Sequence, residues 1–282
     1  MEQDVLKILF FGDITGRQGR NALKSYLQTL KSEDETLDKE SISPFVIANI
    51  ENASHGFGLT KKNYIDLAES GVDCFTSGNH IWDKKDIWEY IDDADKLVRP
   101  LNYPKGTKGK GWRIFETKKG VKVGVINFLG TVFMSPIDSP WRMAKEVIEE
   151  IKKVTPLVII DFHAEATAEK ICFGRYCSEL GASAFFGTHT HVQTADEKIL
   201  NNMAYITDAG FCGTVDSIIG MKYESSVSKF LTCMPERYDV AEGDETQINA
   251  VEVELDINTG YAVAIKRISC NSKVEENKEN EN

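Results

Sequence analysis

The sequence is that of an α/β protein. Short runs of β-branched and aromatic residues recur along most of the chain, as is typical of buried strands. The segments between these runs carry apolar residues at helical spacing. Several of those segments begin at a capping residue followed by proline, or end at glycine, and both are common helix boundaries. Strands that alternate with helices in this way indicate the α/β class.

Seven short apolar runs predict the strands. They are Lys7 to Phe11, Phe45 to Ile50, Asp73 to Thr76, Val121 to Phe128, Leu157 to Phe162, Ala184 to Phe186 and Ala204 to Thr207. Further along, from Gln247 to Ile268, apolar and polar residues alternate on both sides of Asn258-Thr259-Gly260. This alternation around a turn sequence predicts a β-hairpin without a crossover helix.

Four segments predict helices between the strands. Two carry apolar residues three or four positions apart, and the second of these begins at Ser139-Pro140, a capping residue before an N1 proline. The other two run from Lys61 to Ser70 and from Ala168 to Leu180, and each stops before a glycine. The apolar repeats are Leu23, Leu27 and Leu30 in one segment, and Ala144, Val147, Ile148 and Ile151 in the other.

We expect a single domain over residues 1–270. The chain has 282 residues, of which 41% are hydrophobic, and this is enough for a large core. The segment from Phe211 to Asp244 has weak periodicity and several glycines, so it is a lid, an oligomer contact or a plain connection. The last residues, Asn271 to Asn282, are mostly Glu, Asn and Lys, which predicts a disordered acidic tail.

Composition favours a soluble cytoplasmic protein with small anionic substrates. The formal net charge is −11, so an extended complex with duplex nucleic acid is disfavoured. The six cysteines form no Cys-x-x-Cys pair and no secretory leader precedes the first strand, as expected in a reducing cytoplasm. No apolar run approaches the roughly 20 residues that span a bilayer, so we expect no membrane segment.

All five histidines lie in short motifs rich in Asp, Glu, Asn and Gly. This confinement indicates that the imidazoles serve chemistry rather than packing. A fifth motif, Phe11-Gly12-Asp13, is acidic and contains no histidine. The four histidine motifs are Glu51-Asn52-Ala53-Ser54-His55, Ser77-Gly78-Asn79-His80, Asp161-Phe162-His163-Ala164-Glu165 and Gly187-Thr188-His189-Thr190-His191.

The polar residues of these motifs follow the apolar part of predicted strands. Ligands of open α/β sheets bind at the carboxyl ends of the strands, so we expect these side chains to converge there. The candidate metal ligands are Asp13, Glu51, Asn52, Asn79, His163, His189 and His191. This set has too many imidazoles for Mg²⁺ or Ca²⁺ and too many groups for one tetrahedral zinc ion.

The donor set therefore predicts two divalent transition-metal ions. Oxygen and nitrogen ligands without a thiolate suit Mn²⁺, Fe²⁺ or Zn²⁺. Two such ions, roughly 3.5 to 4 Å apart, can lower the pKa of a shared water and clamp the oxygens of a phosphate. The predicted reaction is the hydrolysis of a phosphoester by attack of a hydroxide that bridges the ions.

His80 is the candidate general acid. It follows the candidate ligand Asn79 and should lie at the rim of the site, where an imidazolium can protonate a leaving alkoxide. Asp83 could orient His80, but we favour a role as the cap of a helix that starts at Lys84.

Two other residues of the motifs have two interpretations each. Glu165 either accepts a hydrogen bond from the ring of His163 or begins the next helix. His55 lies on a glycine-rich turn, where it contacts either substrate or only solvent. We keep His55 as a candidate substrate-binding residue.

The order of the motifs resembles that of the calcineurin-like metallophosphoesterases and, more closely, their YmdB-like branch. The resemblance extends from about Lys7 to Ile268 and includes three longer phrases. These are Ser77-Gly78-Asn79-His80-Ile81-Trp82-Asp83, Asp161-Phe162-His163-Ala164-Glu165-Ala166-Thr167 and Asp208-Ala209-Gly210. It implies an αββα sandwich of two mixed sheets flanked by helices and a binuclear iron or manganese centre. It also implies a bacterial cytoplasmic enzyme, often a homo-oligomer, that hydrolyses 2′,3′-cyclic and other cyclic nucleotides.

The resemblance also implies a role for each motif residue. Glu51 would bridge the ions and His80 would be the acid. The ligands of one ion would be Asp13, Asn52 and His191, and those of the other would be Asn79, His163 and His189. Thr15 stands where many metallophosphoesterases have a metal-binding histidine, and Glu51 replaces the usual bridging aspartate. Both departures are features of the branch, and they leave the first ion with fewer imidazoles.

Other functions are compatible with parts of this pattern. A phosphomonoesterase, or a ribonuclease acting on short RNA, could use the same two ions, because all three reactions occur at phosphorus. A regulatory protein that binds RNA or a partner through a vestigial metal site is a different class, and the complete ligand set argues against it. Binuclear hydrolases that act on carbon would have Asp-His soon after the His-x-His pair, whereas Val192-Gln193 follows here.

Overall fold

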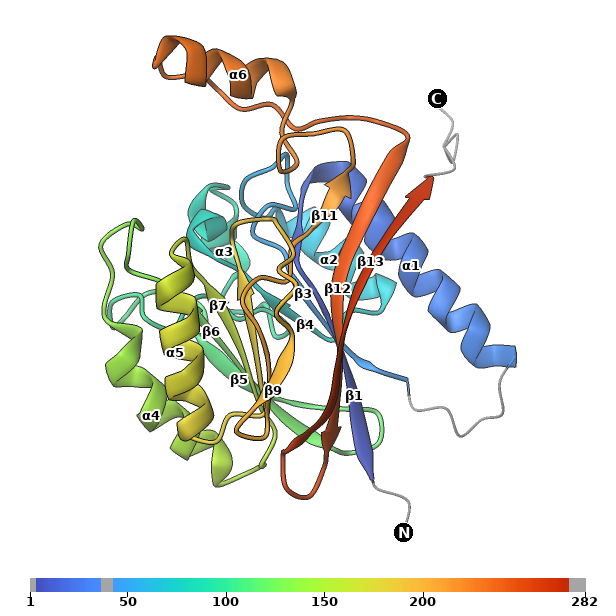
Figure 1. Cartoon of the computed structure of the whole chain (residues 1–282), viewed down its shortest axis with the longest axis vertical. Helices are drawn as coiled ribbons and strands as arrows, with labels where there is room; N and C mark the ends of the chain where they lie inside the picture. The colour runs from blue at the N-terminus through green and yellow to red at the C-terminus, as the bar shows by residue number, and fades with distance from the viewer. Residues whose placement is uncertain (1–3, 37–42, 274–282) are drawn as a thin grey trace.

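The computed structural model describes residues 4–36 and 43–273. Two β-sheets pack face to face in the middle, with α1 and α2 on one outer side and α4 and α5 on the other (Figure 1). This arrangement confirms the α/β class and the αββα sandwich. In the described ranges, no helix is at once long enough and apolar enough to cross a membrane.

The first sheet has seven strands in the order β2-β11-β12-β1-β3-β4, with β13 paired to β12. The strands β1, β3 and β4 are parallel, and β12 runs antiparallel to β1. Their bounds are β1 Val5–Phe11, β2 Asp13–Ile14, β3 Phe45–Asn49, β4 Cys74–Thr76, β11 Phe211–Thr214, β12 Glu245–Asp256 and β13 Ala262–Lys273. The carboxyl ends of three parallel strands therefore meet at one edge of this sheet.

The second sheet has six strands in the order β5-β6-β7-β8-β10-β9. The four inner strands are parallel, and the two edge strands are antiparallel to their neighbours. Their bounds are β5 Trp112–Glu116, β6 Lys122–Leu129, β7 Val158–His163, β8 Ala184–Thr188, β9 Lys198–Leu200 and β10 Met203–Ile206. The sequence did not predict the edge strands β5 and β9, nor the short strands β2 and β11.

The helices cover the outer faces and connect the parallel strands. Their bounds are α1 Gly16–Thr36, α2 Lys61–Ser70, the 3-10 helix η1 Asn79–Trp82, α3 Ile87–Tyr90, α4 Pro140–Lys152, α5 Thr167–Glu179 and α6 Tyr223–Thr232. As predicted, α4 starts after Ser139 with Pro140 in its first turn, and α2 ends at Gly71, whose φ is +114°. Glycine adopts this left-handed backbone without the clash that a Cβ would cause.

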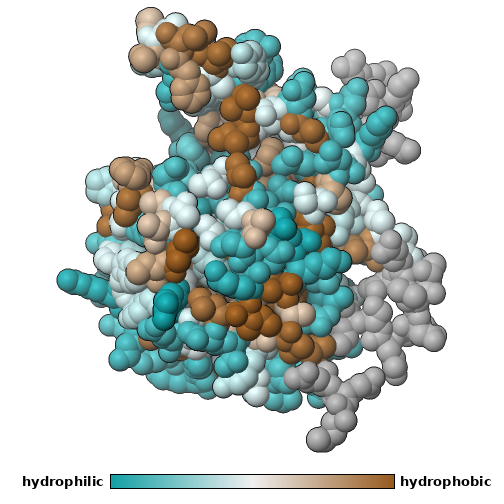
Figure 2. Space-filling view, in the orientation of Figure 1, coloured by the Kyte–Doolittle hydropathy of each residue, from teal (hydrophilic) through white to brown (hydrophobic). Residues whose placement is uncertain are grey.

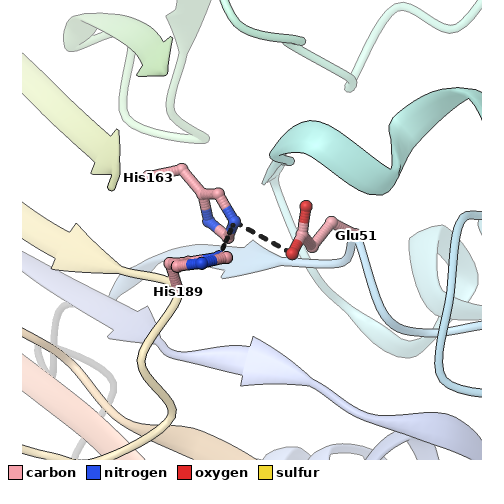
Figure 3. Close-up of side chains that lie close together, drawn as sticks. All are labelled: Glu51, His163 and His189. Carbon is pink, nitrogen blue, oxygen red and sulfur yellow. Dashed lines mark hydrogen bonds and ion pairs between the residues drawn. The ribbon is translucent and has the colours of Figure 1, made fainter. Parts of the chain in front are cut away.

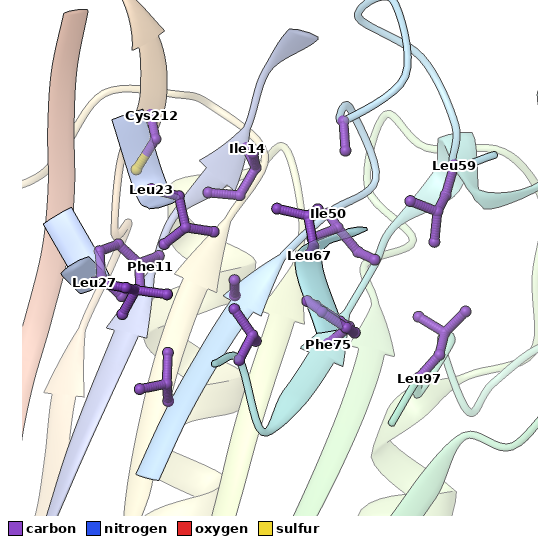
Figure 4. Packing of buried hydrophobic residues seen from close by; sticks show 14 of the residues in the cluster. Phe11, Ile14, Leu23, Leu27, Ile50, Leu59, Leu67, Phe75, Leu97 and Cys212 are labelled. Carbon is purple, nitrogen blue, oxygen red and sulfur yellow. The ribbon is translucent and has the colours of Figure 1, made fainter. Parts of the chain in front are cut away.

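Three apolar layers hold the sandwich together. Between the sheets, the rings of Phe10 and Phe186 stack with centroids 4.3 Å apart, and both are fully buried. Figure 4 shows the layer under α1, where Leu23 and Leu27 pack near Phe11. In the third layer, α4 and α5 cover the second sheet. Burying a side chain of this kind contributes about 1.5–3 kcal/mol, so these layers fix how the two sheets sit against each other.

Two parts of the C-terminal region differ from expectation. The hairpin is longer than predicted because β13 continues to Lys273, so residues 271–273 of the predicted tail belong to the sheet. The rest of the tail, residues 274–282, lies outside the described residues. The segment from Phe211 to Asp244 is more than a plain connection. It contains β11 and the helix α6, which stands away from the sandwich at the top of Figure 1.

Candidate metal centre and active site

The structure brings the polar motifs together at the carboxyl ends of strands from both sheets. In the first sheet, Asp13 follows β1, Glu51 and Asn52 follow β3, and Asn79 follows β4. In the second sheet, His163 is the last residue of β7, and the His189 and His191 pair follows β8. Because the sheets face each other, residues from sequence positions 13 to 191 line one buried space.

Glu51, His163 and His189 form the centre of this space. The Nε2 atom of His163 lies 2.9 Å from Oε1 of Glu51 and 2.9 Å from Nδ1 of His189 (Figure 3). One potential ligand atom of each residue lies within 4.8 Å of those of the other two. These three side chains can therefore reach a single metal ion.

Asp13, Asn52 and His191 form a second group beside the first. The Nε2 atom of His191 lies 3.0 Å from Nδ2 of Asn52 and 3.8 Å from Oδ2 of Asp13. The other oxygen of Asp13 lies 3.7 Å from Nδ1 of His163, so Asp13 faces both groups. The space thus holds a second group of oxygen and nitrogen donors next to the first, and the pair of ions stays a prediction.

Each histidine in the space donates its outer ring proton to a protein acceptor. His191 donates Nδ1–H to the carbonyl of Ile219, at 2.8 Å, and His189 donates Nε2–H to Oε2 of Glu165, at 3.0 Å. His163 donates Nδ1–H to the hydroxyl of Thr188, at 2.9 Å, because that hydroxyl itself donates to Asp161. The other nitrogen of each ring is left facing the space, as a metal ligand requires.

The charges of the centre are compatible with a bound cation. Burial raises the pKa of Asp13 well above its usual value, and the nearby His163 only partly opposes this shift. Burial would also raise the pKa of Glu51, but the neighbouring His163 lowers it to about 2. Burial opposes a charge on His163, yet Glu51 raises the pKa of that ring to about 9. Burial and the nearby His163 lower the pKa of His189 to about 3, so this ring is neutral at pH 7.

Orphaned oxygens and the close approach of Gly78 also fit a metal centre. In the described part of the chain, four buried side-chain oxygens lack a hydrogen-bond partner, and three belong to Asp13, Asn52 and Asn79. A Cβ atom added at Gly78 would lie 2.2 Å from Oε2 of Glu51 and 2.4 Å from Nε2 of His163. The oxygen and nitrogen donors match what Mn²⁺, Fe²⁺ and Zn²⁺ prefer. The residues present therefore fit the predicted pair of ions.

His80 lies at the rim and is oriented by Asp83. The Nδ1 atom of His80 is 2.8 Å from Oδ2 of Asp83, so it donates to the carboxylate and Nε2 remains for a substrate. The ring also packs edge-on against Phe57, with centroids 4.9 Å apart. The prediction that Asp83 caps a helix starting at Lys84 is wrong, because α3 begins only at Ile87.

The structure also revises the interpretations of Glu165 and His55. Glu165 contacts His189 rather than His163, and α5 begins two residues after it, at Thr167, so both predictions for Glu165 are wrong. His55 is exposed on its turn and is not among the residues that line the cavity next to the centre. The structure therefore gives no support to a substrate contact by His55.

The loop after β8 holds its histidines in unusual backbone conformations. The φ angle is +101° at His189 and +62° at His191, a region that costs roughly 1–3 kcal/mol per residue and persists only where the surrounding structure imposes it. The buried Asp208 carboxylate accepts from the Thr190 amide and hydroxyl at 3.1 and 2.7 Å, and from the Lys170 ammonium at 2.6 Å. This buried network fixes the loop. The phrase Asp208-Ala209-Gly210 pointed to Asp208 in the sequence, whereas no sequence pattern pointed to Lys170.

A cavity of 340 Å³ opens beside the centre, within the range of roughly 300–1,000 Å³ that is usual for small-molecule sites. Part of the lining consists of polar residues of the motifs together with Phe57, and the rest comes from the segment between β11 and β12. The motif side includes Glu51, Asn52, His80, Glu165, His189 and His191. The other side includes Ile218, Ile219, Met221, Phe230 and Tyr238, which the sequence alone did not identify.

Comparisons with known proteins find relatives that match over nearly the whole chain. The chain is 47% identical over 267 residues to a 2′,3′-cyclic-nucleotide 2′-phosphodiesterase of Bacillus subtilis, covering 94% of this chain and 97% of that protein. A solved structure of a hypothetical protein from Thermus thermophilus has a TM-score of 0.85 and 36% identity, covering 95% of this chain and all of that one. A solved phosphatase from Mycoplasma pneumoniae has the same TM-score and identity, covering 96% of this chain and 95% of that one.

The comparison with protein families covers nearly the whole fold. Residues 9–268 match the YmdB-like proteins. This range begins in β1 and ends in β13, so it includes both sheets and every motif residue discussed above. The chain belongs to the YmdB-like family.

Proposed function

We propose that the protein is a metal-dependent phosphodiesterase that hydrolyses small cyclic nucleotides, above all 2′,3′-cyclic nucleotides. One observation carries this proposal. Histidine ring nitrogens and unpaired oxygens of Asp13, Asn52 and Asn79 lie together near His80, beside a cavity large enough for a nucleotide. The printed activity of the similar Bacillus subtilis protein supports the same reaction.

The two groups of side chains would hold the two ions. Asn79, His163 and His189 would bind one ion, Asp13, Asn52 and His191 the other, and Glu51 would contact both. Divalent cations in these positions, iron or manganese before zinc, would lower the pKa of a water and neutralise the oxygens of the phosphate. The orphaned amide oxygens of Asn52 and Asn79 would then be satisfied.

The protein's own residues orient the substrate and move the proton. The oxygen of a water molecule forms a new bond to phosphorus, and one bond between phosphorus and a ribose oxygen breaks. That ribose oxygen takes a proton from Nε2 of His80, while Asp83 stabilises the positive ring through Nδ1. The water keeps one proton as it bonds to phosphorus and releases the other to the solvent, from which His80 is reprotonated, and the product is a nucleoside monophosphate.

The test is an assay of the metal-loaded protein with three substrates. We expect turnover of 2′,3′-cyclic AMP with added Mn²⁺, and much slower turnover of 3′-AMP and of a short RNA, as followed by ³¹P NMR. Preference for 3′-AMP would indicate a phosphomonoesterase, and preference for RNA a ribonuclease. If the wild type is no more active than Asp13→Ala on all three substrates, the protein is not an enzyme of this class.

We also propose that the protein is a homo-oligomer and that a second copy covers part of α6. Large apolar side chains are exposed along this projecting segment, and Figure 2 shows apolar surface there, at the top of the view. Tyr223, Leu231 and Met234 are 61%, 79% and 66% exposed. Contiguous apolar surface of this kind is usual at subunit contacts. Sedimentation velocity should give a mass above 31.6 kDa for the wild type and a lower mass for Leu231→Asp. A monomeric wild type would contradict this proposal.

A further inference from the structure

The cavity beside the metal centre has two chemically different halves. The half next to the centre carries the carboxylates, amides and imidazoles that suit a phosphate. The opposite half is formed by Ile218, Ile219, Met221, Phe230 and Tyr238, which we call the apolar wall. A ligand that fills this cavity therefore has one charged end and one apolar end.

Most of the apolar wall lies outside the protein core, and only Met221 is buried. Phe230 is 79% exposed, and Ile218 and Ile219 are 40% and 48% exposed. Phe230 lies one helical turn after Ser226 on α6, and both residues line the cavity, so this face of the helix is turned toward it. The exposure of the Phe230 ring is thus partly exposure to the cavity, and the sandwich does not need the ring for packing.

Several contacts hold the apolar wall in place relative to the centre. The carbonyl of Ile219 accepts the hydrogen bond from Nδ1 of His191, at 2.8 Å. Ile218 and Met221 exchange two backbone hydrogen bonds, at 2.8 and 2.9 Å, which close the turn before α6. The ammonium of Lys229 lies 4.8 Å from the centre of the Tyr238 ring. The apolar wall is therefore tied both to a candidate ligand and to α6.

We propose that the apolar wall is a nucleobase subsite, in which the base of the substrate stacks on Phe230 and Tyr238. This inference rests on the proposed function, because it places the phosphate at the metal centre and the base across the cavity. Every nucleobase has a flat apolar face, and stacking on aromatic rings tolerates differences among bases. The subsite thus selects substrates that carry a base and discriminates weakly among the bases.

The experiment compares a cyclic phosphate that carries a base and a ribose with one that carries neither. One is 2′,3′-cyclic AMP, and the other is glycerol 1,2-cyclic phosphate, which has the same five-membered ring but no base. Loss of one stacking partner lowers affinity by roughly 5- to 100-fold. We expect Phe230→Ala to lower kcat/KM for 2′,3′-cyclic AMP by this factor, mainly through KM, and to leave kcat/KM for glycerol cyclic phosphate unchanged.

Phe133→Ala is the matched control, because Phe133 is 89% exposed and does not line the cavity. It should change neither value. An equal fall for both substrates in Phe230→Ala, with a change in sedimentation, would assign Phe230 to a subunit contact and overturn the subsite. Unchanged values for both substrates would also overturn it.

A binding measurement separates this inference from the proposed function. If the wild type hydrolyses neither substrate, the proposed function fails, and calorimetric titration with 3′-AMP and with glycerol 2-phosphate still tests the subsite. Tighter binding of 3′-AMP by the wild type, lost in Phe230→Ala, supports the subsite. Equal binding of both ligands overturns it. If both cyclic phosphates are hydrolysed with equal kcat/KM, the phosphodiesterase function stands and the subsite is wrong.

Discussion

Gly78→Ala is expected to remove the hydrolysis of cyclic nucleotides by preventing metal binding. The new Cβ would lie 2.2 Å from Oε2 of Glu51 and 2.4 Å from Nε2 of His163, and neither contact is sterically possible. One of these side chains must leave its position, so the pair can no longer approach the same ion. Changes one layer outside a metal site cost about 10- to 100-fold in affinity, and displacement of a ligand should cost at least the upper value.

The measurement is the metal content after dialysis, by mass spectrometry, together with the Mn²⁺ dependence of turnover. Gly243→Ala is the control, because a Cβ there would meet only the Thr214 side chain, at 3.0 Å, and no left-handed backbone is involved. The control should bind metal like the wild type. If Gly78→Ala also retains the wild-type metal content and affinity, the ions do not bind between Glu51 and His163.

His80→Ala is expected to lower kcat for 2′,3′-cyclic AMP by roughly 10²- to 10⁴-fold, the usual contribution of a general acid. The metal content should not change. The group of His80 that contacts Glu51 is its backbone amide, 3.1 Å from Oε2, and this amide persists in the variant. Asp83→Asn should give a smaller loss, because the ring keeps a partner of the same size but loses the negative charge that stabilises the imidazolium.

The leaving group provides the sharper test of the role of His80. The p-nitrophenolate ion leaves without a proton, so His80→Ala should lose much less activity on bis(p-nitrophenyl) phosphate than on 2′,3′-cyclic AMP. Equal losses on both substrates would mean that His80 does not donate the proton. A drop in bound metal would instead assign His80 to the metal centre.

The fold was predictable where one segment by itself has a clear pattern of apolar and capping residues. Parallel strands buried on both faces, such as β6 and β7, are continuous apolar runs, and helices such as α4 have capping residues and a clear repeat. The edge strand β5 is only half-buried, and β9 is three residues long, so their residues show no comparable pattern. These strands exist because a neighbouring strand offers hydrogen bonds, and that is a tertiary cause.

The convergence of the candidate ligands was predictable because strand polarity fixes where their side chains meet. Their partners were not. Asp83 looked like a helix cap because it precedes a polar stretch, but η1 ends before it and its carboxylate is free to bind His80. Glu165 lies two residues after His163 along the chain, yet the loop after β8 brings His189 to it instead. Such pairings depend on the path of a loop from another strand, and no local pattern of residues records that path.

The segment between β11 and β12 lies outside both sheets, and its contact with a candidate ligand is a hydrogen bond through a backbone carbonyl, that of Ile219. Because the backbone supplies that carbonyl, the hydrogen bond to His191 does not depend on which side chain stands at position 219. Under the two proposals above, the residues that act at phosphorus and the residues that hold the base come from separate stretches of the chain.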